Sequence, residues 1–299
     1  MAEAEPAVAV PARERAGRAI VAALRPRQWP KNLLVFAGIL FAAEYDEPGK
    51  WAAAVAAFAA YCAASSAAYL FNDVLDAKED RLHPLKRNRP VASGALSAER
   101  AMGVAALLAV LAVAVLAWFG WASVAYVTGF LALQAVYSYR LKQVVLIDVM
   151  AIAALFVVRA AAGAEVVDVR ISPWLIVCTA LLALFLALAK RRGELVSRAG
   201  NGGGRAVLEG YSFPLLDQLV SIVAACTIVA YSLYTFEARE GSAMMATIPF
   251  VVFGLFRYLI LMHREDLGEE PESVLLSDVP ILATIALWAL TSAVILGLT

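Results

Sequence analysis

Long hydrophobic runs separated by polar connections fill most of the chain. Nine of these runs are predicted to be membrane spans, which need about 20 apolar residues, and the first run is short unless it continues the segment before it. No run alternates polar and apolar residues like a barrel strand, so the spans should be helices and the fold class all-α. Gly120 alone separates the third span from the fourth. The predicted spans are 32–44, 51–71, 101–119, 121–139, 146–166, 172–190, 213–235, 244–263 and 279–298.

The amino-acid composition also indicates a membrane environment. Hydrophobic residues make up 62% of the 299 residues, and the mean hydropathy is +0.75. A water-soluble core of this length cannot bury so much apolar surface, so the bilayer must be the solvent. We expect residues 1–24 to form a cytoplasmic tail, partly disordered or amphipathic, and residues 25–299 to form one transmembrane domain.

Basic residues are distributed unevenly between the two sides of the predicted bundle. With the N-terminus in the cytoplasm, the inward connections carry twenty Lys and Arg residues and the outward connections carry three. Positive charge concentrates on the cytoplasmic side of membrane proteins, so the C-terminus should lie outside. The inward connections are also longer and more polar, and we expect the functional site on the cytoplasmic face. They are residues 1–31, 72–100, 140–145, 190–212 and 264–278.

An acidic segment begins at the cytoplasmic end of the second predicted span. Asn72, Asp76 and Asp80 recur every four residues and Asp73 precedes Asp76 by three, so a helix would bring these side chains to one side. Such oxygen ligands bind Mg²⁺ and leave room for water and substrate phosphate. The alternative is a solvated face whose acids pair with nearby Lys and Arg. Acids at a membrane boundary are usually functional, which favours a magnesium site.

A basic run follows the acidic segment. Lys86, Arg87 and Arg89 precede a turn from Pro90 to Gly94. A cationic run beside metal ligands fits an anionic substrate that bridges the two, although the same residues could anchor to anionic lipid headgroups. His83 lies between the two segments and receives no role, because neutral imidazole is a poor Mg²⁺ ligand.

Other inward helix ends carry further candidate ligands for an anionic substrate. Within the membrane, Arg159 follows Asp148 by eleven residues, about three helical turns, so the two share a helix face. An arginine at this depth must be paired or face a polar cavity. Arg257 in the eighth span is either functional or extends to the interface. The candidates at the helix ends are Lys31, Lys142, Asp148, Lys190, Arg191 and Glu194.

These motifs resemble the UbiA family of intramembrane prenyltransferases. The resemblance rests on Asn72-Asp73-x-x-Asp76-x-x-x-Asp80 followed by Arg89-Pro90-Val91-Ala92-Ser93-Gly94, and it covers the chain from Arg25 onward. It implies nine helices with the active motifs at their cytoplasmic ends. Most of that family has a second aspartate-rich motif after the sixth span, where this chain reads Lys190-Arg191-Arg192-Gly193-Glu194. This departure argues against ordinary aromatic prenyl transfer.

One branch of the family, the actinobacterial decaprenyl-phosphate phosphoribosyltransferases, is more similar. The similar stretches are RPRQWPKN (25–32), NDVLDAKEDRLHPLKRNRP (72–90), LKQVVLID (141–148), Arg159 to Gly163, and AKRRGEL (189–195). The resemblance implies a bacterial plasma-membrane enzyme that transfers 5-phosphoribosyl from phosphoribosyl pyrophosphate to a polyprenyl phosphate. The products would be phosphoribosyl-phosphoryl-polyprenol and pyrophosphate, for the synthesis of cell-wall arabinan precursors.

The resemblance also implies roles for the candidate residues. Mg²⁺, with Mn²⁺ as a candidate substitute, would be held against the pyrophosphate by Asn72, Asp73, Asp76 and Asp80, the three aspartates being the catalytic candidates. The phosphates would be bound by Lys86, Arg87, Arg89, Lys142, Lys190 and Arg191. Asp148 would accept hydrogen bonds from ribose hydroxyls, Glu194 would join the substrate-binding set, and Lys31 or Arg159 would guide the lipid phosphate.

Two rival functions stay open at this point. A conventional UbiA-type enzyme would move a polyprenyl group from its diphosphate to an aromatic acceptor, and it predicts acids within 190–195. A transporter or lipid-binding scaffold would explain Arg159 and leave the Asn72–Asp80 set unexplained. The expected partners are the two substrates, membrane lipid and further copies of the chain, with a trimer as the candidate state. No nucleic-acid partner is expected.

Overall fold

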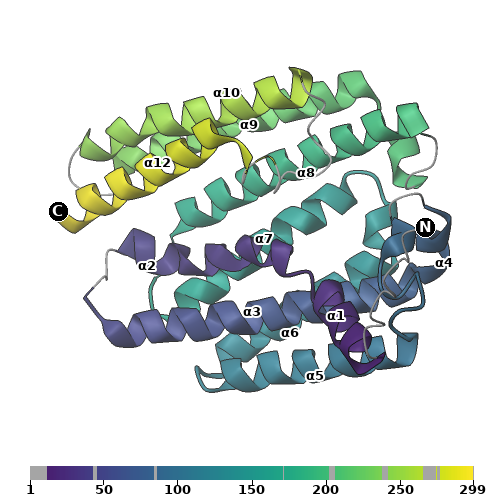
Figure 1. Ribbon diagram of the computed structural model, residues 1–299. Helices are drawn as coiled ribbons and strands as arrows, with labels where there is room; N and C mark the ends of the chain where they lie inside the picture. The colour runs from purple at the N-terminus through teal and green to yellow at the C-terminus, as the bar shows by residue number, and fades with distance from the viewer. Residues whose placement is uncertain are drawn as a thin grey trace, which may run out of the picture.

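The long helices of the described structure run along a common direction (Figure 1). The computed structural model describes residues 12–298 except 43–45, 84–85, 171, 202–205, 238–241, 265–273 and 275–276. Within these residues every regular element is an α-helix or a 3₁₀-helix, which confirms the all-α prediction. Of the predicted tail, residues 1–11 lie outside the described residues and Ala12–Leu24 form helix α1.

The helices follow one another with short connections. The first half of the chain contains α1, η1 (Pro26–Phe36), α2 (Ala37–Ala42), α3 (Pro48–Leu75), α4 (Ala77–Leu82), η2 (Lys86–Asn88), α5 (Ala98–Ala117) and α6 (Trp121–Tyr139). The second half contains η3 (Leu141–Gln143), α7 (Ile147–Val166), α8 (Pro173–Asn201), η4 (Ala206–Gly210), α9 (Phe213–Glu237), η5 (Ser242–Thr247), α10 (Ile248–Arg264) and α12 (Val279–Leu298).

Two groups of helices pack on either side of a central pair. Helices α3, α5 and α6 form one group and α8, α9, α10 and α12 form the other, with α7 and the η1–α2 segment between them (Figure 1). Helix α7 contacts α3 and α6 on one side and α8 on the other. The polar connections around α4 lie at the end of the bundle opposite the C-terminus. The ends of several helices therefore meet around the acidic segment.

The first predicted span is built differently from the expected apolar helix at 32–44. The 3₁₀-helix η1 starts at Pro26 and continues directly into α2, and residues 43–44 lie outside the described part of the chain. A 3₁₀-helix has three residues per turn, so Trp29, Asn32 and Val35 align on one face. Asn32 and Val35 are buried, and Trp29 Nε1 donates to Ser66 of α3. This face attaches the segment to its neighbours.

Close backbone contact joins η1–α2 to α7. A Cβ placed on Gly163 would lie 2.0 Å from the carbonyl oxygen of Val35, and one on Gly38 would lie 2.8 Å from Cα of Ala164. Both positions therefore require glycine. Packing of small residues is how membrane helices associate, because lipid provides no hydrophobic drive between them.

Helix α3 uses alanine for the same purpose. Buried alanines recur every three or four residues along it, at Ala54, Ala57, Ala60, Ala64 and Ala67. This spacing produces a smooth face on which α5, α6 and η1 approach closely.

Six stretches are long and apolar enough to cross a membrane: Pro48–Leu75, Ala98–Ala117, Ile147–Val166, Phe213–Glu237, Ala243–Arg264 and Val279–Gly297. They match six of the nine predicted spans. The other three predicted spans correspond to the η1–α2 segment, α6 and α8. The predicted break at Gly120 is confirmed, since this residue has φ 103° and precedes α6 directly.

Helix α8 extends beyond its predicted end at residue 190 and continues to Asn201. The segment 190–195, expected in a connection, is therefore helical. Successive residues on a helix point about 100° apart. Arg191 thus faces α7 while Arg192 reaches Asp217 of α9 and the carbonyl oxygen of Met262 in α10.

Candidate active site

The acidic segment spans the junction between α3 and α4. Helix α3 ends at Leu75, Asp76 caps it, and α4 starts at Ala77. The expected continuous helical face through Asn72, Asp76 and Asp80 is therefore interrupted at Asp76. Asn72 Nδ2 still donates to Asp76 Oδ2 at 3.0 Å, whereas Asp80 lies within α4 and pairs with Arg89.

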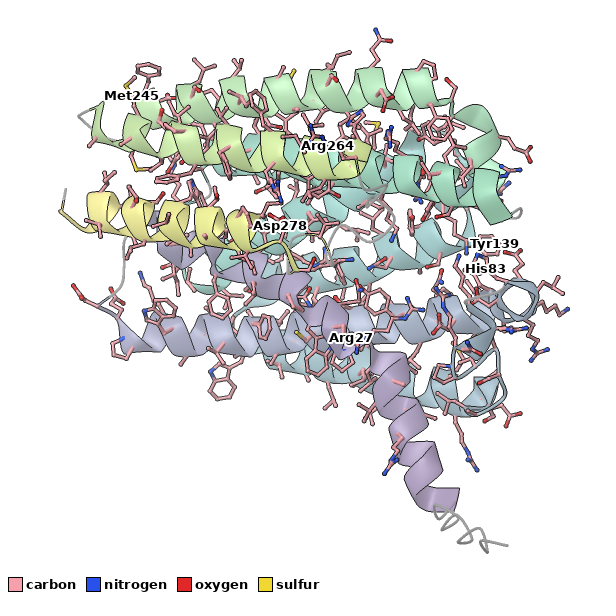
Figure 2. All side chains as sticks on the ribbon, turned by 45° about the horizontal axis from the view of Figure 1, so that its top comes forward. Arg27, His83, Tyr139, Met245, Arg264 and Asp278 are labelled. Carbon is pink, nitrogen blue, oxygen red and sulfur yellow. The ribbon has the colours of Figure 1, made fainter. Side chains whose placement is uncertain are left out.

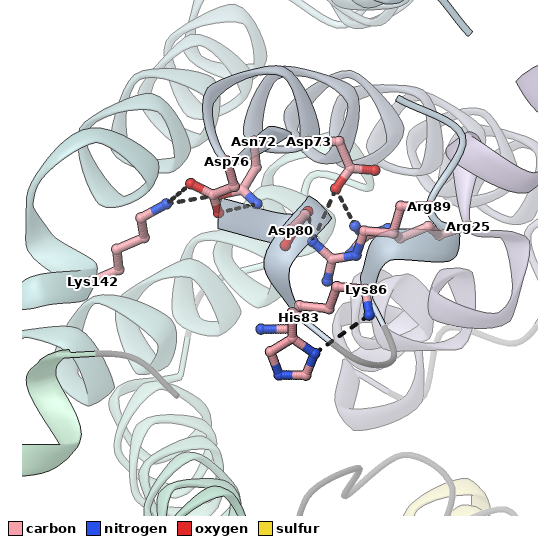
Figure 3. Close-up of polar contacts among 9 residues, drawn as sticks. All are labelled: Arg25, Asn72, Asp73, Asp76, Asp80, His83, Lys86, Arg89 and Lys142. Carbon is pink, nitrogen blue, oxygen red and sulfur yellow. Dashed lines mark hydrogen bonds and ion pairs between the residues drawn. The ribbon is translucent and has the colours of Figure 1, made fainter. Parts of the chain in front are cut away.

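Two arginines from different parts of the chain converge on Asp73 and Asp80 (Figure 3). Arg89 Nη1 lies 2.7 Å from Asp80 Oδ2 and 3.3 Å from Asp73 Oδ1, and Arg25 pairs with the same Asp73 oxygen. Both aspartates are buried. Asp73 Oδ2 is buried too and has no hydrogen-bond partner among the described residues. This oxygen therefore lacks the partner that a buried carboxylate oxygen normally has.

Lys142 approaches the acids from the opposite side (Figure 3). Its ammonium group pairs with Asp76 Oδ1 and lies 3.4 Å from Asn72 Oδ1. Lys142 lies in η3, which links α6 to α7, and it is 66 residues from Asp76 in the sequence. Its side chain is largely buried.

The rest of the basic run lies at the edge of this cluster. Arg87 is exposed, and Lys86 is half-buried with its backbone N–H donated to His83 Nδ1 at 3.4 Å. Figure 2 shows His83 and Tyr139 at the same end of the bundle and Met245 at the other. The acidic segment, the basic run and the end of α6 thus meet at one end.

A second polar cluster joins α7 to α8. Arg191 and Asp148 are both fully buried, with Arg191 Nε 2.6 Å from Asp148 Oδ2. Arg191 also donates to Glu194 and, at 3.2 Å, to the Tyr137 hydroxyl of α6. Tyr211 donates to the other Asp148 oxygen at 2.7 Å. A buried ion pair is favourable only when its remaining donors and acceptors are satisfied, and these residues satisfy them.

Arg159 and Asp148 lie on one continuous helix, α7, as expected, but they have different partners. Arg159 is 3% exposed, its Nε donates to Asn32 Oδ1 at 2.9 Å and its Nη1 donates to the Leu155 carbonyl. Its guanidinium also lies over the rings of Phe130 and Phe156, at 4.7 and 5.0 Å from the centroids. Arg159 thus has partners within the bundle and connects α7 to η1.

The remaining candidates have simpler surroundings. Lys31 is half-buried in η1, next to Asn32, and Lys190 is half-buried in α8, next to Arg191. Arg257 of α10 pairs with Asp278 at 2.8 Å, and Asp278 Oδ1 accepts from Ile281 N–H at the start of α12. Arg257 therefore joins α10 to α12.

Sequence reasoning missed several residues of the site. It names Arg25 only as the first residue of a motif, and it does not single out Tyr137, Tyr211 or Asn32. Arg25 lies within the RPRQWPKN stretch, so that motif was a usable signal. A single tyrosine in a connection such as 206–212 gives no local signal.

In the described part of the chain, no three carboxylate, histidine or cysteine groups are arranged around a common point that could hold a metal ion. Instead the three aspartates face three cations. The acids still supply only oxygen donors, which hard divalent cations prefer. Together with the unpartnered oxygen of Asp73, this donor set has the chemistry of a divalent-cation site, although its carboxylates are paired with Arg and Lys in this structure.

Residues 32–279 match the family model described as UbiA prenyltransferase family. The chain belongs to this family. The UbiA homologue from Archaeoglobus fulgidus bound to GPP and Mg²⁺ is 17% identical, with a TM-score of 0.72, and the match covers 94% of this chain and 100% of that one. The UbiA fold therefore holds for the whole bundle.

Two similar members of the UbiA family are named for one activity. The decaprenyl-phosphate phosphoribosyltransferase of Mycolicibacterium smegmatis is 34% identical over 92% of this chain and 91% of its own length. The enzyme of the same name from Mycobacterium tuberculosis is 33% identical over 87% of this chain and 88% of its own length. The likeness spans nearly the full length of both relatives.

Proposed function

We propose that this protein transfers the 5-phosphoribosyl group from phosphoribosyl pyrophosphate to decaprenyl phosphate or a similar polyprenyl phosphate. The main support for this proposal is the likeness to decaprenyl-phosphate phosphoribosyltransferases over about nine-tenths of the chain. In the reaction, an oxygen of the lipid phosphate attacks C1 of the ribose, and the bond from C1 to the pyrophosphate oxygen breaks. The products are decaprenylphosphoryl-5-phosphoribose, a precursor for cell-wall arabinan, and pyrophosphate.

Asn72, Asp73, Asp76 and Asp80 are the proposed ligands of Mg²⁺, with Mn²⁺ as a substitute. Metal binding in relatives supports this proposal, since the Archaeoglobus homologue has been described with Mg²⁺ and with Cd²⁺. The bound ion would neutralise the charge that develops on departing pyrophosphate. Asp73 would turn its unpartnered buried oxygen toward the cation.

The cations around the acids are the proposed phosphate ligands. Arg25 and Arg89 approach from one side and Lys142 from the other, so an anion between them would be held on two sides. Guanidinium groups donate paired hydrogen bonds to phosphate, and Lys142 adds a point charge. Lys86, Arg87 and Lys190 at the edge of the site are candidates for the ribose 5-phosphate.

Positioning is the main task for the acceptor. The lipid phosphate is already an anion at neutral pH, so attack requires alignment and charge shielding more than a general base. Lys31 of η1 is the proposed guide for this phosphate. Arg159 holds η1 in place through Asn32. The isoprenoid tail would lie between helices or in lipid.

We assign a supporting role to the buried cluster of Asp148, Arg191 and Glu194. In their network one arginine pairs with two carboxylates, whereas the second motif of most of the UbiA family is rich in aspartate. Arg191 is fully buried on Asp148, so we assign this pair to support of the η3 connection and not to direct phosphate binding. No observation favours prenyl transfer to an aromatic acceptor.

All nine predicted spans are proposed to cross the membrane, with the N-terminus and the active site in the cytoplasm. The site end of the bundle is rich in Lys and Arg, as the positive-inside rule requires. The opposite end exposes Trp51, Trp118 and Trp121, and tryptophan is typical of a membrane interface. We propose a homo-oligomer, with a trimer as the candidate state.

The test is transfer of radiolabel by the purified protein. Phosphoribosyl pyrophosphate labelled in the ribose is incubated with decaprenyl phosphate and Mg²⁺, with and without EDTA, and the organic phase is counted. We expect label in the organic phase only when metal is present. Transfer that persists in EDTA would contradict the metal assignment, and a lack of transfer with metal would contradict the function.

A further inference from the structure

The connection between η3 and α7 contains a strained residue. Leu146 has φ 66° and ψ −41°, a backbone conformation that residues other than glycine rarely adopt. Such a conformation persists only when surrounding contacts hold it. Lys142, which pairs with Asp76, lies four residues earlier on the same connection. The strained residue thus helps to set where Lys142 lies.

Tyr211 holds this residue from the connection between η4 and α9. The Leu146 N–H donates to the Tyr211 hydroxyl at 2.8 Å, and the hydroxyl donates to Asp148 Oδ1 at 2.7 Å. Burial raises the pKa of the Tyr211 phenol, and its hydrogen bond to Asp148 raises this pKa further. The phenol therefore keeps its proton for Asp148 at neutral pH.

Two neighbouring contacts keep Tyr211 in register with the connection. A Cβ on Gly210 would lie 2.3 Å from Cγ2 of Val145, so the backbone at Gly210 packs directly on the residue before Leu146. Asp148, the acceptor of the Tyr211 proton, is itself fixed by the fully buried Arg191. One hydroxyl group therefore joins the second half of the bundle to the connection that carries Lys142.

We infer that Tyr211 is a positioning residue for the donor diphosphate, acting through Leu146 on Lys142. The inference rests on the proposed function for its substrate. Without the hydroxyl, the Leu146 N–H and one Asp148 oxygen lose a buried partner, and the connection can relax to an unstrained conformation. Lys142 would then no longer be held beside Asp76.

Magnesium pyrophosphate is the probe that tests this inference without turnover. Its binding to the full-length protein in detergent is measured by calorimetry for the wild type, Tyr211→Phe, Lys142→Ala and the double variant. We expect Tyr211→Phe to weaken binding about tenfold, the size of a lost buried hydrogen bond. We expect no further loss in the double variant relative to Lys142→Ala, because both changes remove one interaction.

Tyr231→Phe is the matched control. Its hydroxyl is also buried between two partners, Thr247 and Trp288, but lies toward the opposite end of the bundle. A merely structural role for Tyr211 predicts the same affinity as this control, with only a lower melting temperature. In the transfer assay, Tyr211→Phe should raise KM for phosphoribosyl pyrophosphate about tenfold and change kcat less than twofold.

Three results would overturn the inference: unchanged pyrophosphate affinity in Tyr211→Phe, additive losses in the double variant, or no binding of magnesium pyrophosphate by the wild type. Failure of the proposed function has a different signature. In that case the wild type and its variants would bind magnesium pyrophosphate as expected, while no label would reach decaprenyl phosphate.

Discussion

Asp73 combines two ion pairs with one unpartnered buried oxygen. Its position at the last turn of α3 follows from the sequence, because the apolar run of the second span ends there. Its partners could not be predicted in the same way. Arg25 lies 48 residues before Asp73, and several basic residues compete for that role in the sequence. Only the packing of η1 against α3 selects Arg25.

Replacing Asp73 by Asn tests its proposed role as a metal ligand. We expect transfer to fall by about 100-fold or more, because electrostatic stabilisation of the charge on a leaving group contributes strongly to catalysis. Glu79→Gln is the control, since Glu79 is an exposed acid of α4 in the same segment. Near-normal initial rates for Asp73→Asn, measured with radiolabelled donor, would contradict the assignment.

Arg89 provides a second test at the level of single residues. One nitrogen of its guanidinium, Nη1, contacts both Asp73 and Asp80. A planar guanidinium has further N–H groups for binding phosphate, which the single ammonium of lysine lacks. We expect Arg89→Lys to raise KM for the donor about tenfold. The same exchange at exposed Arg100 should leave KM unchanged. Equal KM values for the two variants would show that the guanidinium of Arg89 is dispensable for donor binding.

Among the elements, η1 differs most from the sequence-based prediction. The apolar run at 32–44 predicts a short span by itself. The 3₁₀ geometry of η1 and its start at Pro26 depend on contacts with α3 and α7, which no local pattern reveals. The long helices were easier to predict, because their apolar runs are uninterrupted and end at polar residues. The extension of α8 to Asn201 was missed because the segment after residue 190 is charged.

Gly163→Ala tests the contact between α7 and η1. The added methyl would lie 2.0 Å from the Val35 carbonyl oxygen, so the helices must separate. We expect a loss of about 1–3 kcal/mol, typical of overpacking, and a melting temperature lower by several degrees in detergent. Gly129→Ala is the control, because space is open around Gly129 in α6. A stability equal to that of the control would show that η1 can shift freely.

The pair formed by Asp278 and Arg257 predicts a pH dependence for the contact of α10 with α12. Hydrogen bonding from Arg257 lowers the pKa of Asp278. A carboxyl whose folded pKa lies below its unfolded value of about 3.9 stabilises the fold above that value, and this contribution disappears as pH falls through the folded pKa. Wild type should therefore lose more thermal stability than Asp278→Asn between pH 6 and pH 3. Parallel losses would exclude this pair as a cause.

At the scale of the whole molecule, the order of the apolar runs predicted the order of the long helices, and six of the nine runs correspond to described helices that are long and apolar enough to cross a membrane. The way in which the helices pack into two groups around α7 was not predictable, because lipid-facing and core-facing residues are both apolar in a membrane protein. For the same reason, the sequence does not reveal which helix ends contribute to the site. The charge asymmetry predicts orientation, because it depends only on counts in the connections.

Reporter fusions test that orientation. We expect green fluorescent protein at the N-terminus to be fluorescent, since it folds in the cytoplasm, and alkaline phosphatase at the C-terminus to be active, since it requires the outside. Both measurements use intact cells. An inactive phosphatase together with a fluorescent C-terminal fusion would place both termini inside and contradict the proposed nine spans.

The most direct test of the account is mass spectrometry of the lipid product. Purified protein, Mg²⁺, phosphoribosyl pyrophosphate and decaprenyl phosphate should yield a lipid heavier than the acceptor by one phosphoribosyl group. One pyrophosphate should be released for each lipid formed. Release of pyrophosphate without a modified lipid, or a product that lacks the ribose 5-phosphate, would contradict phosphoribosyl transfer at this site.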